Sequence, residues 1–228
     1  DIPKGITSLN KNLFYKCTQL KSITIPEGVK ELGISVFEEC SSLETIILPE
    51  GLVLINDKAF YHCYNIQSIF IPESVRTIGD FVFHSCSNLQ SIVLPKGVTR
   101  IGEELFNTCS RLQSITIPES VNDISNNAFQ SCSSLPSIII PESVTIFKNY
   151  VFYQCSSLQS FTIPSKVETI EIGAFQSCSS LQSIIIPKSV TTIGISVFKS
   201  CVSLLSIAIS GNLKIISEFA FNDCINLQ

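Results

Sequence analysis

Ten cysteines divide this chain at equal intervals. Each stands 23 residues after the one before it, at the positions Cys17, Cys40, Cys63, Cys86, Cys109, Cys132, Cys155, Cys178, Cys201 and Cys224. A phenylalanine precedes every cysteine by three residues, and a leucine follows it by three, except at Ile66. Such a fixed period is typical of repeat proteins, in which each repeat is one structural unit that buries its apolar face against its neighbours.

The rest of the repeat predicts what one unit builds. Its consensus reads C-x-x-L-x-S-I-x-I-P-x-x-V-x-x-I-G-x-x-x-F-x-x. Residues such as 181–186 place apolar side chains two apart among β-branched residues, which predicts a short strand with one buried face, and proline ends it. Identical strands at a fixed spacing must run parallel, so the remaining residues form the crossover. There we expect a short helical turn near the phenylalanine, and glycine where a turn needs positive φ.

This consensus resembles the BspA-like class of leucine-rich repeats over the whole chain. The resemblance implies a leucine-rich-repeat solenoid with a parallel β-sheet on the concave side and short helical or 3-10 turns and loops in the crossovers. We expect residues 1–228 to form a single array of about ten repeats, cut within a repeat at both ends and without caps. Members of the class occur as arrays on the surfaces of host-associated bacteria and anaerobic protists, and several are implicated in adhesion.

Composition argues against several functions. The formal net charge of −4 is spread along the chain, so no basic surface for nucleic acid is expected. No apolar run reaches the about 20 residues that a membrane-spanning helix needs. The sequence also lacks a glycine-rich phosphate loop and a nucleophile paired with a base. We therefore expect a chain that is not an enzyme and has no catalytic residues, cofactor or metal site.

The regular spacing of the cysteines indicates buried free thiols. In stacked coils, equivalent Cβ atoms lie about 4.8 Å apart and point the same way, whereas a disulfide needs Cβ atoms about 3.8 Å apart that face each other. A metal needs ligands from several directions, and the repeat offers one thiol per coil. We interpret the ten cysteines as a structural ladder of small apolar side chains.

The two histidines, His62 and His84, precede a cysteine in variable columns, and we interpret them as surface residues. The serines five residues after most cysteines, such as Ser68, have no base beside them and are interpreted as an outward ladder. Neither residue type predicts catalysis.

A binding surface is predicted on the concave sheet. Strand alternation places residues five and seven after each cysteine on its outer face. The second of these columns is more apolar than a solvated sheet requires, and aromatic residues such as Phe70 dominate interface energies. The alternative is that β-branched residues simply favour strands. The predicted binding residues are Ile47, Phe70, Val93, Gln67, Gln90, Ile139 and Ile185.

Two further columns are weaker candidates. One, ten residues after each cysteine, contains Glu27, Glu50, Glu73, Lys96, Glu119, Glu142, Ser165 and Lys188. It could attract a basic partner or a divalent cation, but solvated carboxylates beside interrupting lysines explain it better, and we do not predict a metal site here. The other is a group of tyrosines that either contact a partner or cover the crossover, namely Tyr15, Tyr61, Tyr64 and Tyr153.

Three functions remain open at this stage. The first is a non-catalytic module, on the cell surface or secreted, that binds a host or extracellular-matrix protein through the concave sheet, as the resemblance implies. The second is a cytoplasmic protein-interaction scaffold or regulator, which fits the absence of any N-x-S/T motif among 13 asparagines and the many free thiols. The third is a self-assembling structural array.

Overall fold

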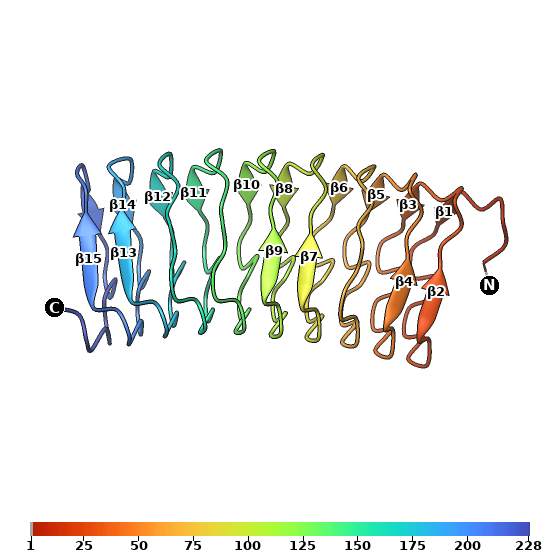
Figure 1. Cartoon of the computed structure of the whole chain (residues 1–228), viewed down its shortest axis with the longest axis horizontal. Coiled ribbons are helices and arrows are strands. Elements are labelled where there is room, and N and C mark those ends of the chain that lie inside the picture. The colour runs from red at the N-terminus through yellow and green to blue at the C-terminus, as the bar shows by residue number, and fades with distance from the viewer. Residues whose placement is uncertain (1) are drawn as a thin grey trace.

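The chain forms a solenoid of stacked coils, one coil for each 23-residue repeat, as Figure 1 shows. The structure is a computed structural model that describes residues 2–228. Each complete coil runs up one side of the solenoid, turns at the proline, descends on the other side and returns through the turn that carries phenylalanine and cysteine. Because the coils follow one another along one axis, residues 23 apart in sequence become neighbours in space.

The strand expected after each cysteine is present in most coils, and these strands form what we call the front row. It consists of β2 (Ser22–Thr24), β4 (Thr45–Ile47), β7 (Ser91–Val93), β9 (Ser114–Thr116), β13 (Ser183–Ile186) and β15 (Ser206–Ile209). All pairs are parallel and shifted by one repeat, so that Thr24 lies beside Ile47 and Val93 beside Thr116. The expected parallel strand with one buried face is therefore confirmed.

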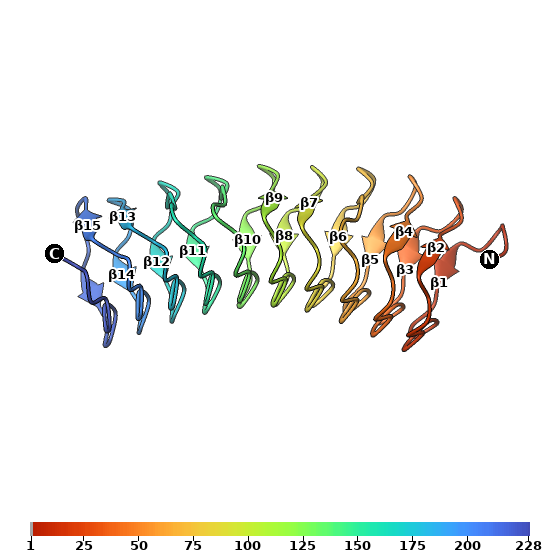
Figure 2. The same ribbon diagram turned by 60° about the horizontal axis from the view of Figure 1, so that its bottom comes forward.

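The descending side holds a second set of parallel strands, which we call the back row. Its strands are β1 (Ser8–Leu9), β3 (Glu31–Leu32), β5 (Leu54–Ile55), β6 (Thr77–Ile78), β8 (Arg100–Ile101), β10 (Asp123–Ile124), β11 (Ile146–Phe147), β12 (Thr169–Ile170), β14 (Thr192–Ile193) and β16 (Ile215–Ile216). Figure 2 shows that the two rows lie on opposite sides of each coil. Each of the ten described coils has a two-residue strand in the back row. The crossover is therefore more regular than the sequence suggests.

The front row is interrupted where the back row is not. After β9, residue Pro136 stands where other coils have a residue with an N–H, and it cannot donate to the preceding coil. In the next coil Phe161 replaces an aliphatic residue and packs edge-on against Phe147 and Phe175, with ring centroids 5.6 Å and 4.8 Å away. Neither of these two coils has an assigned front strand. The coil of Phe70 also has no front strand and pairs only at Ser68, through a single bridge to Ser91, so the front row consists of three separate pairs of strands.

The core is a ladder of phenylalanines and cysteines beneath both rows. The rings of Phe83 and Phe106 stack with centroids 5.6 Å apart and planes within 3°, and the same stacking continues along the chain. Aliphatic side chains from both rows fill the remaining interior. Burial of one coil against the next thus supplies the apolar stabilisation that a single coil lacks.

The turn at the phenylalanine is not helical in the described residues. Its residues five before and one before each cysteine adopt positive φ, for example Lys58 at 57° and His62 at 58°. This conformation aims alternate amides at the next coil, where the N–H groups of Lys58 and His62 donate to the carbonyls of Asp80 and His84 at 2.9 Å. The amides that alternate with them donate within the coil, as Tyr61 does to Lys58 O at 3.1 Å. The turn therefore divides its backbone hydrogen bonds between its own coil and the next one.

The glycine of the repeat has a different role from the one expected. Gly33, Gly79, Gly102 and Gly194 do not have positive φ. Instead, the backbone of the preceding coil lies close to them, and a Cβ on Gly33 would come within 2.5 Å of the Leu9 carbonyl oxygen. Glycine is used here for close packing between coils rather than for a left-handed turn.

Candidate binding face

The predicted binding residues are all exposed, and three of them, Ile47, Val93 and Ile185, belong to the front strands β4, β7 and β13. Phe70 and Ile139 lie at the equivalent positions of coils without a front strand and expose 67% and 83% of their surface, while the preceding residues Ile69 and Ile138 are buried. Gln67 and Gln90 are exposed at the start of their coils' front segments. The alternation inferred from the sequence therefore holds in the structure, although exposure alone does not make these residues a binding site.

The structure brings three of the predicted residues together and separates the others. Ile47, Phe70 and Val93 come from consecutive coils, and the pairing of Ser68 with Ser91 places Phe70 beside Val93. We call these three residues the apolar stripe. Ile139 stands between the coils of Thr116 and Thr162, so a hydroxyl-bearing residue interrupts the column on both of its sides. Ile185 pairs with Ala208 and likewise lies outside the stripe.

Exposed charges border the stripe where the front strands end in proline. The residues of this column, which we call the charged row, are Glu27, Glu50, Glu73, Lys96, Glu119, Glu142, Ser165 and Lys188, and all are exposed. Two carboxylates accept a backbone N–H of the next coil: Glu73 from Lys96 at 3.2 Å, and Glu142 from Ser165 at 2.8 Å. The row is therefore partly tied to the backbone and not simply a set of repelling charges.

A hollow opens between the stripe and the charged row. Its apolar lining comes from Val93, Leu94, Ile117 and Pro118, and its charged lining from Glu73, Lys96 and Glu119. Sequence reasoning did not identify this hollow, because its walls belong to three successive coils. Ile117 is only half-buried here, whereas its equivalent Leu94 in the preceding coil is 2% exposed.

All ten cysteines are free thiols, and the structure places eight of them fully inside the ladder. Only Cys17 and Cys224, in the coils at the two ends, are partly exposed. Each buried Sγ lies near a carbonyl of the preceding coil, so that Cys109 donates to Phe83 O at 3.1 Å. Burial raises the pKa of Cys40 to about 11 and that of Cys155 to about 12. Thiolate, the reactive form, is therefore scarce at neutral pH.

The interpretation of the histidines as surface residues is wrong for His84. Its side chain is only 16% exposed, and its Nδ1 lies 3.0 Å from Oε2 of Glu104, although the two atoms are not aligned as a hydrogen bond. Its ring stacks on Tyr61 at 4.7 Å and lies 5.6 Å from the ring of His62, which is half-buried. Burial lowers the pKa of His84, and the carboxylate of Glu104 opposes that shift.

This aromatic cluster escaped sequence reasoning because most of its contacts do not follow the period. Tyr61 and His84 share a column, but His62 and Glu104 lie 22 and 20 residues from His84, whereas column analysis compares residues 23 apart. The tyrosines of the weaker candidate group enter the cluster in part, since Tyr64 stacks on His62 at 5.3 Å. These ring–ring contacts cover part of each ring, so less of its surface is open to a partner.

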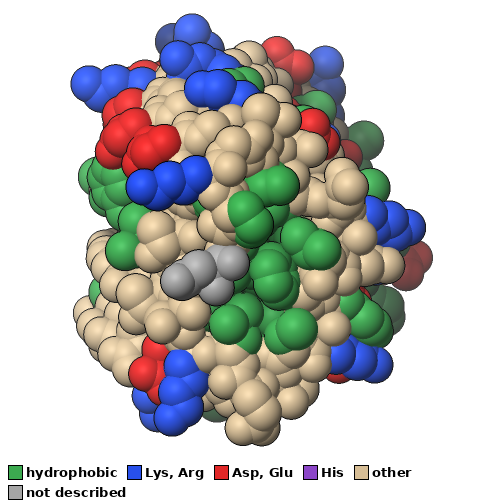
Figure 3. All heavy atoms as spheres, turned by 90° about the vertical axis from the view of Figure 1, so that its right-hand side faces the viewer, with side chains coloured by type: hydrophobic (Ala, Val, Ile, Leu, Met, Phe, Trp, Pro, Cys, Tyr) green, Lys and Arg blue, Asp and Glu red, His purple; other side chains and the backbone are tan. Residues whose placement is uncertain are grey.

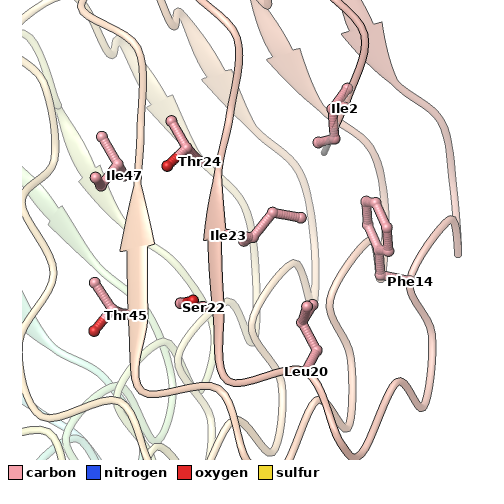
Figure 4. Close-up of a pocket in the computed structure, with 8 residues that line it drawn as sticks. All are labelled: Ile2, Phe14, Leu20, Ser22, Ile23, Thr24, Thr45 and Ile47. Atoms are coloured by element: carbon pink, nitrogen blue, oxygen red, sulfur yellow. The ribbon is translucent and has the colours of Figure 1, made fainter.

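Apolar side chains also gather on the end face of the first coil, which Figure 3 views directly. A hollow there has a volume of about 420 Å³, and Ile2, Phe14, Leu20 and Ile23 contribute its apolar lining. Figure 4 shows Phe14, Leu20 and Ile23 pointing toward this common space. The same columns are covered by a neighbouring coil elsewhere, so this hollow is the exposed end of the core ladder.

Two features are absent from residues 2–228. No group of three or more histidine, cysteine or acidic side chains is arranged to hold a metal ion in this part of the chain. The same residues contain no helix of the length and apolarity required to cross a membrane.

The coil geometry, the 23-residue period and the stacked phenylalanines define a leucine-rich-repeat solenoid. The model of the BspA-type leucine-rich-repeat region matches residues 1–113 and 99–228, so the chain belongs to this family. A comparison with curated proteins gives no significant match.

Solved structures of bacterial leucine-rich-repeat proteins share the fold. A leucine-rich-repeat protein from Bacteroides ovatus is 32% identical over 98% of this chain, with a TM-score of 0.89, and the chain spans 58% of that protein's length. A leucine-rich cell surface protein from Faecalibacterium prausnitzii is 29% identical over 98% of this chain and 78% of its own, with a TM-score of 0.54. The pneumococcal vaccine antigen PcpA, 19% identical over 94% of this chain and 61% of its own, has a TM-score of 0.58 and shows the fold alone.

Proposed function

We propose that this chain is a non-catalytic adhesion module, on the cell surface or secreted, that binds a protein partner through the outer side of its front row. The chain is a leucine-rich-repeat scaffold, a type of structure typical of protein-interaction modules. The observation that carries the proposal is the apolar stripe of Ile47, Phe70 and Val93, which presents large side chains to solvent on three consecutive coils. Exposed apolar patches of this kind mark interaction surfaces.

Support for a surface location comes from similarity. One relative of 29% identity bears the name of a leucine-rich cell surface protein. A host or extracellular-matrix protein is the partner that fits such a location. A cytoplasmic scaffold, the alternative, would use the same stripe on an intracellular partner, so one binding experiment distinguishes the two.

The test compares the chain with Phe70→Thr. Threonine occupies the same column at Thr24, Thr116 and Thr162, so the variant keeps a residue that the fold already accommodates. Immobilised extracellular-matrix proteins and a cytosolic lysate serve as baits. Saturable binding to a matrix protein that Phe70→Thr weakens at least tenfold supports the adhesion module.

The matched control is Ile139→Thr, which removes an even more exposed apolar residue from the same column outside the stripe. It should bind like the wild type. Binding that is confined to cytosolic proteins would favour the intracellular scaffold, and equal loss in both variants would show that the stripe is not a distinct site.

A further inference from the structure

We infer that the partner segment that covers the apolar stripe carries a lysine or arginine beside its apolar residue, and that this cation enters the hollow between Glu73 and Glu119. The inference rests on the proposed function and adds the chemistry of the partner. It depends on the juxtaposition of the stripe, the hollow and the charged row, none of which defines a partner by itself.

The geometry joins the two halves of the site at Val93. This residue is the third member of the stripe and also lines the hollow, together with Leu94, Ile117 and Pro118. A side chain that leaves the stripe toward the proline end of the strands therefore passes over apolar surface first. Lysine and arginine have apolar stems with a charged tip, and such side chains cover apolar surface while the charge stays in water.

The charged row beside the hollow favours a cation. Along five consecutive coils the charged row holds four carboxylates and one amine, from Glu27, Glu50, Glu73, Glu119 and Lys96. The nearby guanidinium of Arg76 donates to the carbonyls of Glu73 and Val75 at 2.6 Å and 3.2 Å. Within residues 2–228 it forms no ion pair with Glu73 or Glu119, so both carboxylates of the hollow are without a salt-bridge partner. Complementary charge of this kind selects partners and speeds encounter more than it adds affinity.

Removal of Lys96 provides a test that is specific to this inference. It lines the hollow between the two carboxylates and forms no ion pair within residues 2–228. An incoming cation must share Glu73 and Glu119 with it. Removal of the Lys96 charge should therefore strengthen the binding of a basic partner, an effect that purely apolar docking on the stripe would not show.

The experiment selects peptides from a random 12-residue phage library on the immobilised chain and measures the most enriched peptide by fluorescence anisotropy. The expected peptides contain an aromatic or large aliphatic residue within three positions of Lys or Arg. Their binding should weaken about fivefold in Glu73→Gln/Glu119→Gln and strengthen about twofold in Lys96→Gln, in line with solvent-exposed ion pairs. Raising the salt concentration should reduce both differences.

The matched control is Glu168→Gln/Glu218→Gln, which removes the same two charges from exposed positions far from the hollow. A loss of affinity as large as in the Glu73 and Glu119 variant would mean that net charge alone acts, and it would overturn the inference. Selected peptides that depend on Phe70 but contain no basic residue would also overturn the inference. They would leave the proposed function intact. A selection without Phe70-dependent peptides contradicts both.

Discussion

Phe70 and Phe83 show how differently one residue type is used on the two sides of a coil. Phe83 is fully buried in the ladder and stacks on Phe60 and Phe106 at 5.6 Å, as every equivalent phenylalanine stacks on its neighbours. Phe70 is 67% exposed, and other coils have threonine, isoleucine, valine or alanine at its position. The interior columns are constrained by the coils above and below, whereas the outward column is free to vary and can therefore carry recognition.

The largest expected effect is on the buried side of this comparison. Phe83→Ala removes a ring that contacts rings in both neighbouring coils and should destabilise the solenoid by about 3–5 kcal/mol. Urea denaturation followed by circular dichroism measures the change. A loss below about 1 kcal/mol would mean that the coils close around the cavity and that the ladder is less rigidly packed than the stacking suggests.

A smaller loss is expected in the cysteine column. Cys109→Ala deletes the thiol that donates to Phe83 O, which keeps the backbone N–H of Cys86 as a donor at 3.0 Å, so the expected cost is that of one hydrogen bond, about 0.5–1.5 kcal/mol. The same denaturation experiment measures it, with Cys224→Ala at the partly exposed end of the ladder as the control.

Titration of the native wild type with an aromatic disulfide reagent should modify the end residues Cys17 and Cys224 first. Fast modification of all ten thiols without denaturant would contradict the buried ladder.

The pH dependence of stability tests the cluster around His84. The burial of this histidine lies between that of Phe83 and that of Phe70. Since burial lowers the folded-state pKa of His84, the unfolded chain binds more protons in acid. The stabilisation is complete above the unfolded pKa of about 6.5 and is lost as the pH falls below it. The melting temperature should therefore decrease as the pH is lowered from 8 to 5.

The variant His84→Asn isolates this contribution, because Asn107 occupies the same column in the next coil. It should show a shallower decline than the wild type over the same pH range. Glu104→Gln removes the charge that opposes the lowering of the His84 pKa. The melting temperature of this variant should therefore fall more steeply with decreasing pH than that of the wild type. Identical pH profiles for the wild type and His84→Asn would mean that His84 does not titrate differently in the two states.

The smallest effect is expected at the exposed end of the comparison. Phe70→Thr should change stability by less than about 0.5 kcal/mol, because the side chain is mostly in water in the folded chain. The denaturation midpoint is the measurement. A loss approaching that of Phe83→Ala would show that Phe70 packs against the coils in solution, and it would remove the stripe as a candidate site.

The sequence was sufficient to predict the columns that face inward and outward. Because each interior residue meets the same residue type one repeat away, the pattern of a single repeat specifies most of the core. The exposure of Phe70, Ile139 and Ile185 follows from strand alternation in the same way. The alternation could not indicate that only Ile47, Phe70 and Val93 would be contiguous and next to a hollow.

By itself, the sequence determined the solenoid, its period and its stacked interior, since a fixed spacing of apolar residues leaves one consistent way to bury them. The tertiary structure decided everything that depends on contacts outside the 23-residue register. The thiol of Cys109 reaches a carbonyl 26 residues earlier, and His84 reaches a carboxylate 20 residues later. Side-chain direction and the close approach of neighbouring backbones set these contacts, and neither is encoded in the spacing of a single column.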